Sequence, residues 1–191
     1  MSESASPSVL DTWRGRWAYR AASAAAERRQ PVTWSGHPAA RKVLVVLPDE
    51  DDAVRSVWRF LKRLDLPSAN VIPVSRGGHV VYAPDDFIGR VRVLQKADYR
   101  RITGLPKAAQ AAAIWAEAPE VALSLRHPFD LNAAYLVGAA PARFRIGFHD
   151  PLAEPFFDFM LAPTADLDAA LVALERYLAS VSPPVLAFRD A

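Results

Sequence analysis

The sequence predicts a three-layer α/β/α domain with a mostly parallel sheet, preceded by an amphipathic helix. Its 191 residues are 51% hydrophobic and 23% charged, a composition that supplies enough apolar surface for one folded core. The run Lys42–Leu47 is short, unbroken and rich in β-branched residues, as in a strand that helices bury on both faces. Strand-like and helix-like segments then alternate along the chain, which favours parallel strands joined by helices.

Residues 1–40 are expected to form a basic amphipathic helix and a linker, ahead of a single Rossmann-like domain at 41–191. From Ser8 to Arg29, apolar side chains recur at spacings of three and four residues: Leu10, Trp13, Trp17 and Ala21. The segment Gln30–Ala40 contains two Pro and one Gly, which indicates a linker or a covering strap.

The elements of the domain follow in order from the Lys42–Leu47 strand. Acidic residues after Pro48 suit the start of a helix, and apolar residues at helical spacing continue this helix to Asp65. The next expected strands are short: Val71–Val74, His79–Ala83, and the strand-like residues Val91 and Val93. Further helices are expected at 107–116, 129–139 and 165–181, and further strands at 121–125, 143–148 and 156–161.

Composition and charge restrict the classes of function. The chain has no Cys, no signal-like N-terminus and no apolar run of about 18 residues, so we expect a protein that is not transmembrane and lies in the cytoplasm, with peripheral membrane contact as an option. Residues 1–41 hold six Arg and three acidic residues, a net charge of +3, whereas the remainder carries −1. Basic residues beyond position 41 are scattered among acidic ones, so there is no specific nucleic-acid signature.

One segment resembles a known family. Glu120–Phe148 contains a strand, a helix with the pair Ala133-Ala134, then Gly138-Ala139 and the strand Arg143-Phe-Arg-Ile-Gly-Phe148. In this order it resembles the N-terminal half of family 9 glycosyltransferases, the heptosyltransferase group. Residues 40–180 are even more similar to a bacterial family of small α/β proteins known as a domain of unknown function. The resemblance implies a Rossmann-like fold and no particular activity.

Two features separate the chain from such a glycosyltransferase. The turn Leu47–Asp52 holds four carboxylates and no Gly, whereas a phosphate-binding turn needs Gly, and four adjacent carboxylates would repel a phosphate. A second Rossmann domain would also be needed to hold a nucleotide sugar. We therefore transfer no donor-site residue, and assign no catalytic residue and no cofactor.

Polar residues after the first two strands are candidate ligand-binding groups, because open α/β sheets place ligands at the carboxyl ends of their strands. Asp49 and Asp51 could hold a divalent cation, or could simply favour the N-terminus of the next helix. Arg76 and His79, beside two glycines, could wrap an anion or belong to a plain turn.

Two further pairs follow later strands and could meet above the sheet. Arg126 and His127 come after the strand at 121–125, and His149 and Asp150 come after the strand at 143–148. We assign no metal site, because the four His are too widely spaced for a helical metal pair. Ser124 lacks the G-x-S-x-G context of a nucleophile elbow.

The N-terminal helix is the candidate partner-binding element, through Trp13, Arg14, Arg16, Trp17 and Arg20. Its pattern suits docking on its own domain or a protein partner, an anionic membrane surface, or RNA phosphates. Docking on its own domain is the default expectation, because a helix with two Trp usually completes a core.

The hypothesis that these observations favour is a non-catalytic binding or adaptor domain with a glycosyltransferase-like Rossmann fold. The fold signals agree with one another, whereas the catalytic signatures are absent or broken. The alternative is a transferase-like enzyme that acts on a small anionic or sugar-phosphate substrate at the carboxyl edge of the sheet.

Overall fold

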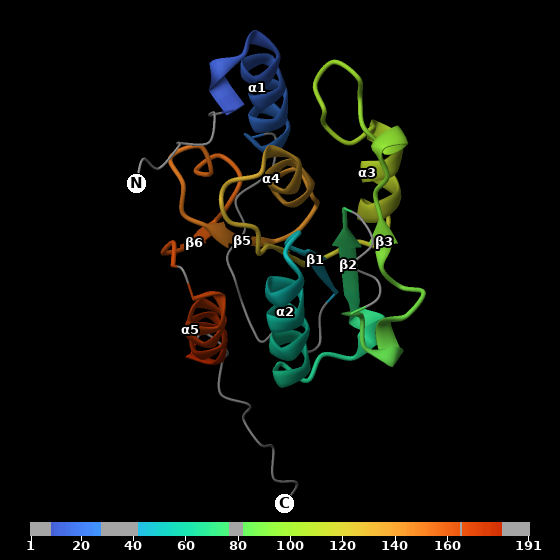
Figure 1. Cartoon of the computed structure of the whole chain (residues 1–191), viewed down its shortest axis with the longest axis vertical. Coiled ribbons are helices and arrows are strands. Elements are labelled where there is room, and N and C mark those ends of the chain that lie inside the picture. The colour runs from blue at the N-terminus through green and yellow to red at the C-terminus, as the bar shows by residue number, and fades with distance from the viewer. Residues whose placement is uncertain (1–8, 28–41, 77–81, 165, 181–191) are drawn as a thin grey trace, which may run out of the picture.

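The computed structural model describes residues 9–27, 42–76, 82–164 and 166–180 (Figure 1). These residues form one sheet of six parallel strands in the order β3-β2-β1-β4-β5-β6. The strands are β1 (Val43–Val46), β2 (Val71–Ser75), β3 (Arg92–Val93), β4 (Val121–Ser124), β5 (Phe144–Phe148) and β6 (Phe159–Leu161). This order and direction confirm the Rossmann-like α/β fold.

Helices cover the sheet and connect its strands. The α-helices of the described residues are α1 (Trp13–Glu27), α2 (Asp51–Arg63), α3 (Ala108–Trp115), α4 (Leu131–Gly138) and α5 (Leu167–Ser180). Short 3-10 helices are η1 (Val9–Asp11), η3 (Ser68–Asn70), η5 (Asp85–Phe87) and η6 (Lys96–Asp98). None of the helices in these ranges has the length and apolarity that crossing a bilayer requires.

The centre of the sheet is apolar on both faces. β1 lies between β2 and β4, with Leu44 opposite Ile72 on one side and Ala122 on the other. All four residues of β1 are buried, as expected for a central strand of a parallel sheet. Val45 and Val46 lie in the cores on opposite faces, because side chains alternate along a strand.

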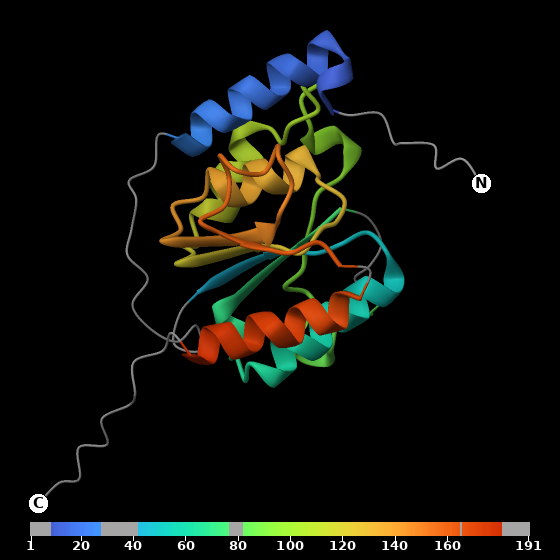
Figure 2. The same ribbon diagram turned by 90° about the vertical axis from the view of Figure 1, so that its left-hand side faces the viewer.

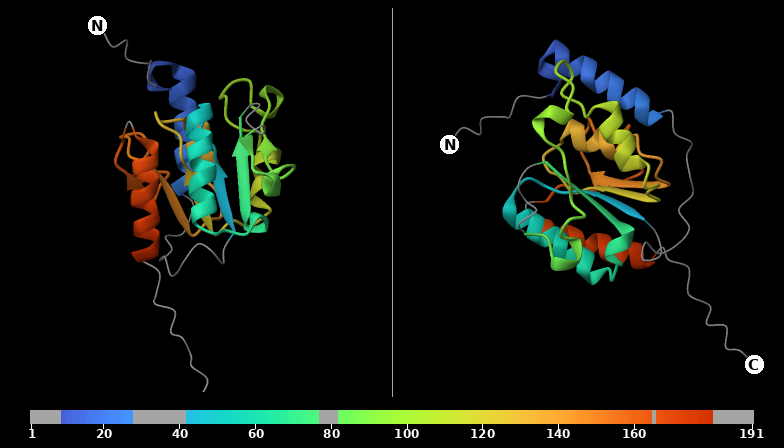
Figure 3. Two further views of the ribbon diagram at one scale, coloured as in Figure 1. Left: turned by 60° about the horizontal axis from the view of Figure 1, so that its bottom comes forward. Right: turned by 90° about the vertical axis from the view of Figure 1, so that its right-hand side faces the viewer.

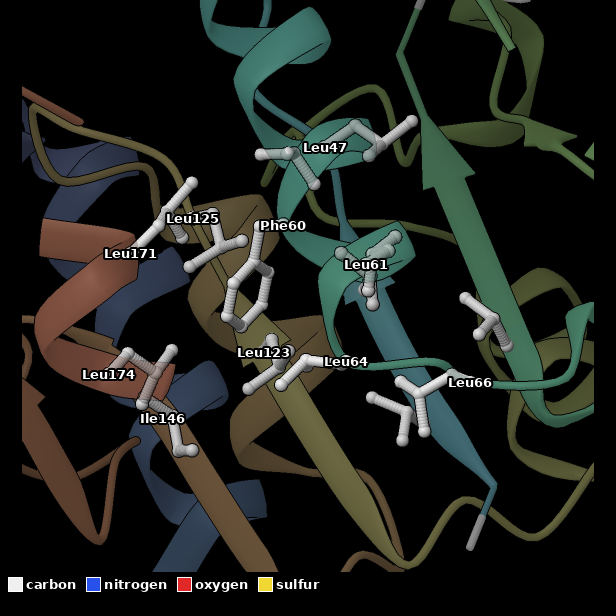
Figure 4. Packing of buried hydrophobic residues seen from close by; sticks show 14 of the residues in the cluster. Leu47, Phe60, Leu61, Leu64, Leu66, Leu123, Leu125, Ile146, Leu171 and Leu174 are labelled. Carbon is white, nitrogen blue, oxygen red and sulfur yellow. The ribbon is translucent and has the colours of Figure 1, made fainter. Parts of the chain in front are cut away.

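The two faces of the sheet have separate cores. In Figure 4, Phe60 of α2 and Leu171 and Leu174 of α5 pack over Leu123 and Ile146 of the sheet. The core on the other face contains residues of α1, α3 and α4. Figure 2 and the right-hand view of Figure 3 show α2 and α5 on one side of the sheet, with the other three helices opposite.

Helix α1 forms a fourth layer outside α4 (Figure 2). Its buried residues are all alanines, Ala18, Ala22 and Ala26, and each is fully buried. Small side chains at a spacing of four let two helices approach closely. At the edge of this contact, the Tyr19 hydroxyl donates to the Leu152 carbonyl oxygen at 3.2 Å, and the Tyr19 ring lies edge-on to Phe156.

The docking of α1 differs from the expectation that its Trp stripe completes the core. Trp13 is 62% exposed and Trp17 is 53% exposed, so the large apolar side chains point away from α4. The sequence pattern gives most weight to the largest apolar residues, whereas a close contact between two helices is made by the smallest ones. The contact on the domain is therefore made by the alanine face.

The expected strand at His79–Ala83 needs correction. Residues 79–81 lie outside the described residues, and Tyr82 and Ala83 are not in a strand. The strand beside β2 is β3, which pairs Arg92 with Val74.

Two other expected boundaries also have an outcome. Strand β6 starts at Phe159, three residues later than expected. The Gln30–Ala40 linker is also outside the described residues, so the domain boundary at residue 40 stays a prediction.

Candidate functional site

The strand order reverses between β1 and β4, because β2 and β3 extend from one side of β1 and β5 and β6 extend from β4. In open α/β sheets the carboxyl ends of the strands form a crevice at such a point. Four charged residues lie there: Asp49 after β1, Arg76 after β2, Arg126 after β4, and Asp130 at the N-cap of α4. We call these four residues the switch-point network.

The network is built around Arg126. Its Nη1 donates to Asp49 Oδ1 at 2.6 Å and its Nη2 donates to Asp49 Oδ2, which makes a bidentate guanidinium–carboxylate pair. Arg76 Nη2 donates to Asp49 Oδ2 at 2.8 Å and lies 3.0 Å from Asp130 Oδ2. Each guanidinium therefore contacts both carboxylates, since Arg126 Nη2 also lies 3.5 Å from Asp130 Oδ2.

Asp130 has a second, structural role. Its Oδ1 accepts a hydrogen bond from the Ala133 backbone N–H at 2.8 Å, which caps the N-terminus of α4. Capping fixes the carboxylate, so that Oδ2 faces the two arginines. The side chain of Arg126 is only 10% exposed and that of Asp130 17% exposed, so the inner half of the network is shielded from water.

The network stays charged at neutral pH. Burial by itself raises the pKa of Asp49, but the hydrogen bonds and positive charges of Arg126 and Arg76 outweigh burial and lower this pKa to about 2. For Arg76, burial acts to lower the pKa, and the carboxylates of Asp130 and Asp49 more than reverse this effect and raise it. Two positive and two negative groups are thus balanced in one cluster.

A small pocket adjoins the network: its empty volume, including the part open to solvent, is about 230 Å³, and about 10 Å³ of it can hold the centre of a water-sized sphere. Apolar side chains from β1, β2, α4 and the segment after β3 line it together with polar ones: Val46, Val74, Ser75, Arg76, Leu94, Tyr99, Arg126, Asp130, Asn132, Ala133 and Leu136. Burial raises the pKa of Tyr99, with Arg76 opposing and Asp130 reinforcing the rise, so its phenol is neutral near pH 7. The residues that line the pocket therefore carry uncharged hydroxyl groups as well as charged guanidinium and carboxylate groups.

Two polar atoms of this pocket's lining residues have no hydrogen-bond partner among the described residues. They are the Ser75 hydroxyl oxygen and Arg126 Nε, and both atoms are buried. Ser75 is only 1% exposed. A buried polar atom without a partner is costly, so each of these atoms would gain from a hydrogen bond to an ordered water or, after a small movement of its surroundings, to a ligand.

The other candidate residues lie at different places. Asp51 is in the first turn of α2, where it accepts a hydrogen bond from the Tyr82 hydroxyl at 2.8 Å. His127 and Asp150 line a second small pocket, together with Arg126. His149 is exposed and does not line that pocket.

The outcome for the expected groupings is mixed. Asp49, Arg76 and Arg126, which the sequence placed in three separate candidate groups, come together in one network. The pair Arg126 and His127 meets Asp150 but not His149. His79 lies outside the described residues. Across the part of the chain that the structure describes, no three His, Asp or Glu side chains form a group that could hold a metal ion.

Three residues of the pocket escape the sequence reasoning. Asp130 carried a usable signal, because Asp at the start of a predicted helix is a common N-cap and this one stands four residues after Arg126. Ser75 was part of the expected turn but was not singled out. Tyr99 has no signal in the sequence, because it comes from a poorly periodic segment whose path only the fold defines.

The fold and the pocket define the chain as a Rossmann-like α/β domain with a small pocket, lined by apolar and polar residues, at its switch point. Comparisons with protein families, with curated proteins and with solved structures found no match for this chain. The resemblance to family 9 glycosyltransferases and to the bacterial domain of unknown function therefore stays a prediction.

Proposed function

We propose that this protein is a binding domain for an uncharged, hydroxyl-bearing ligand, such as a polyol or a sugar, one hydroxyl group of which enters the switch-point pocket. The observation that carries the proposal is the pair of buried, unpartnered polar atoms, Ser75 Oγ and Arg126 Nε, on residues that line one pocket. Such atoms are hydrogen-bonded in most folded proteins, so a ligand oxygen at this place would complete the site.

The balance of charge supports an uncharged ligand. Arg76 and Arg126 already contact the two carboxylates of the network, so an anion would meet Asp49 and Asp130 without a guanidinium left over. A hydroxyl group both donates and accepts hydrogen bonds, which suits a mixed lining of this kind. Arg126 Nε–H needs an acceptor, and Ser75 Oγ can donate or accept.

The size and the walls of the pocket support one hydroxyl-bearing end of a ligand. Only about 10 Å³ of the pocket can hold the centre of a water-sized sphere, which is room for about one hydroxyl group. Val46, Val74 and Leu136 give it apolar walls, against which the carbon atom that bears this hydroxyl group would pack.

The enzyme alternative, a transferase-like reaction on a small anionic or sugar-phosphate substrate, stays a prediction. The contacts among the described residues define hydrogen-bond donors and acceptors, and they support binding more directly than a reaction step. The same experiment separates the two hypotheses, because it compares neutral sugars with their phosphates.

A thermal-shift titration of the full chain tests the proposal. Neutral monosaccharides and polyols are compared with the corresponding sugar phosphates and with inorganic phosphate. A ligand at 100 times its dissociation constant stabilises the folded state by about 2.7 kcal/mol, which a melting curve resolves. We expect a shift with members of the neutral group.

Ser75→Ala is the variant that tests the site, and Ser124→Ala is its matched control. Both serines are buried, and they end β2 and β4, the two strands that flank β1. Ser124, however, does not line this pocket. We expect Ser75→Ala to lose the shift and Ser124→Ala to keep it. A shift with the phosphates alone, a shift that survives Ser75→Ala, or no shift with any neutral compound contradicts the proposal.

A further inference from the structure

Helix α1 has two chemically different faces, and only one of them is used inside the molecule. Ala18, Ala22 and Ala26 are fully buried in the core that α1 shares with α4. At about 100° per residue, the nine positions from Trp13 to Ala22 place these two residues on opposite sides of the helix. Trp13 and Trp17 are accordingly 62% and 53% exposed.

The exposed face is also basic. Arg14, Arg16 and Arg20 are all exposed, and the Arg14 guanidinium lies 5.5 Å from the centre of the Trp13 ring. Arg16 donates to the Leu10 carbonyl oxygen at 2.9 Å, and no salt bridge between described residues involves any of the three arginines. The sequence from Trp13 to Ala26 contains no Asp or Glu.

We propose that this outer face of α1, formed by Trp13, Arg14, Arg16, Trp17 and Arg20, binds a membrane surface that contains anionic lipids. Indole rings are amphipathic and lie at the level of lipid headgroups, where one side is apolar and the other is wet. Guanidinium groups form charge-assisted hydrogen bonds with phosphate and carboxylate oxygens, which the headgroups of anionic lipids present.

The position of α1 favours a broad surface over a pocket. The helix is the outermost layer on its side of the sheet (Figures 1 and 2), and Ala18, Ala22 and Ala26 hold it against α4. Its exposed Trp and Arg side chains therefore belong to a helix that is already folded, so binding does not have to order one. The charge of the chain agrees, since residues 1–41 carry +3 and the rest carries −1.

Co-sedimentation of the full chain with vesicles tests this proposal. Vesicles of phosphatidylcholine alone are compared with vesicles that contain about one-third phosphatidylserine, in roughly 0.05 M and 0.5 M salt. We expect binding to the anionic vesicles at low salt, weak binding to the neutral ones, and a marked loss at high salt. Equal binding to both kinds of vesicle, or none to either, overturns the proposal.

Surface variants show whether α1 carries the binding. Arg16→Gln and Arg20→Gln should each weaken binding about fivefold, which is the contribution of one basic side chain near an anionic surface. The double variant Trp13→Ala with Trp17→Ala should also weaken it. Ile88→Ala is the apolar control because Ile88, directly after η5, is 60% exposed, and Arg176→Gln is the charge control on α5.

The controls and two other partners give the outcomes that contradict the proposal. All variants change exposed side chains, and unchanged melting curves establish that each is folded. If the two controls weaken binding as much as the α1 variants do, the surface is not α1. If the chain retards RNA at the same salt but does not sediment with vesicles, or if it only forms a stable complex with itself, α1 serves another partner.

Discussion

Asp49 contacts two guanidinium groups at once, and its protonation state therefore controls a cluster of four charges. The folded-state pKa of about 2 lies below the ordinary value of 3.8. A carboxyl whose pKa is lowered by folding stabilises the protein above its ordinary pKa, and this contribution disappears as the pH falls through the folded-state pKa. The relevant pH window is therefore between about 4 and 2.

We predict that Asp49→Asn destabilises the protein near neutral pH and that this effect shrinks as the pH falls toward about 2. The expected loss at neutral pH is on the order of 1 kcal/mol, because the Asp49 side chain is 36% exposed and solvent screens part of the interaction. Chemical denaturation of both proteins across the pH range measures it.

Asp52→Asn is the matched control for this pH dependence. Asp52 is only three positions further along the chain, but its side chain is 98% exposed, and among the described residues its ion pair is with Arg55 at 3.4 Å. The free energy of unfolding of Asp52→Asn should match that of the wild type at each pH. A difference between wild type and Asp49→Asn that does not change with pH would show that Asp49 acts through packing.

At the scale of one element, α4 is packed from both sides. Its N-cap Asp130 belongs to the switch-point network, and α1 lies along its outer side. At its other end, a Cβ atom added to Gly138 would lie 2.7 Å from Phe156 Cδ1 and 3.1 Å from Phe156 Cα. Glycine at this position is therefore required by the close approach of Phe156, which is fully buried.

Gly138→Ala should lower the free energy of unfolding by about 1–2 kcal/mol. In an open helix the same substitution would stabilise the protein by up to about 1 kcal/mol. Here the clash with Phe156 costs roughly 1–3 kcal/mol, and we expect this cost to outweigh the gain. A double-mutant cycle with Phe156→Leu checks the cause, because a smaller side chain relieves the contact. Additive effects of the two substitutions would exclude Phe156 as the obstacle.

Comparison of elements shows how much the sequence alone could predict. The strand at Lys42–Leu47 was predictable because a run of β-branched residues has few other stable placements. The face of α1 was not, because Ala18, Ala22 and Ala26 contribute little to a hydrophobic pattern while Trp13 and Trp17 dominate it. Only the shape of α4 determines which of these faces fits.

The pocket shows the same division at the scale of single side chains. Asp49, Arg76 and Arg126 were predictable as neighbours, because each follows a parallel strand and these strands end at one edge. Tyr99 was not predictable, since its place depends on the path of the long segment between β3 and α3. That Ser75 Oγ and Arg126 Nε are buried without a hydrogen-bond partner among the described residues can be recognised only once the fold is known.

At the scale of the whole molecule, α1 is predicted to be structural through its alanine face. Deletion of residues 1–27 would expose the part of α4 and Phe156 that α1 covers. We expect the truncated chain to lose about 2–4 kcal/mol of stability, and its melting temperature to fall by roughly 5–15 °C.

The salt dependence of this truncation separates packing from charge. Apolar burial is not screened by salt, so the difference in melting temperature should be the same at low and high salt. A truncated chain that keeps the melting temperature of the full chain would show that the contact between α1 and α4 contributes no stability.

Both edges of the sheet are short, and this limits how the molecule can associate. β3 is two residues long and β6 is three. The side chain of Arg92, on β3, is held by Glu117 at 2.5 Å, which places a charged pair along that edge. A strand from another chain would find few unpaired backbone groups to bond with and a charged pair in its path, so growth of the sheet from molecule to molecule is disfavoured.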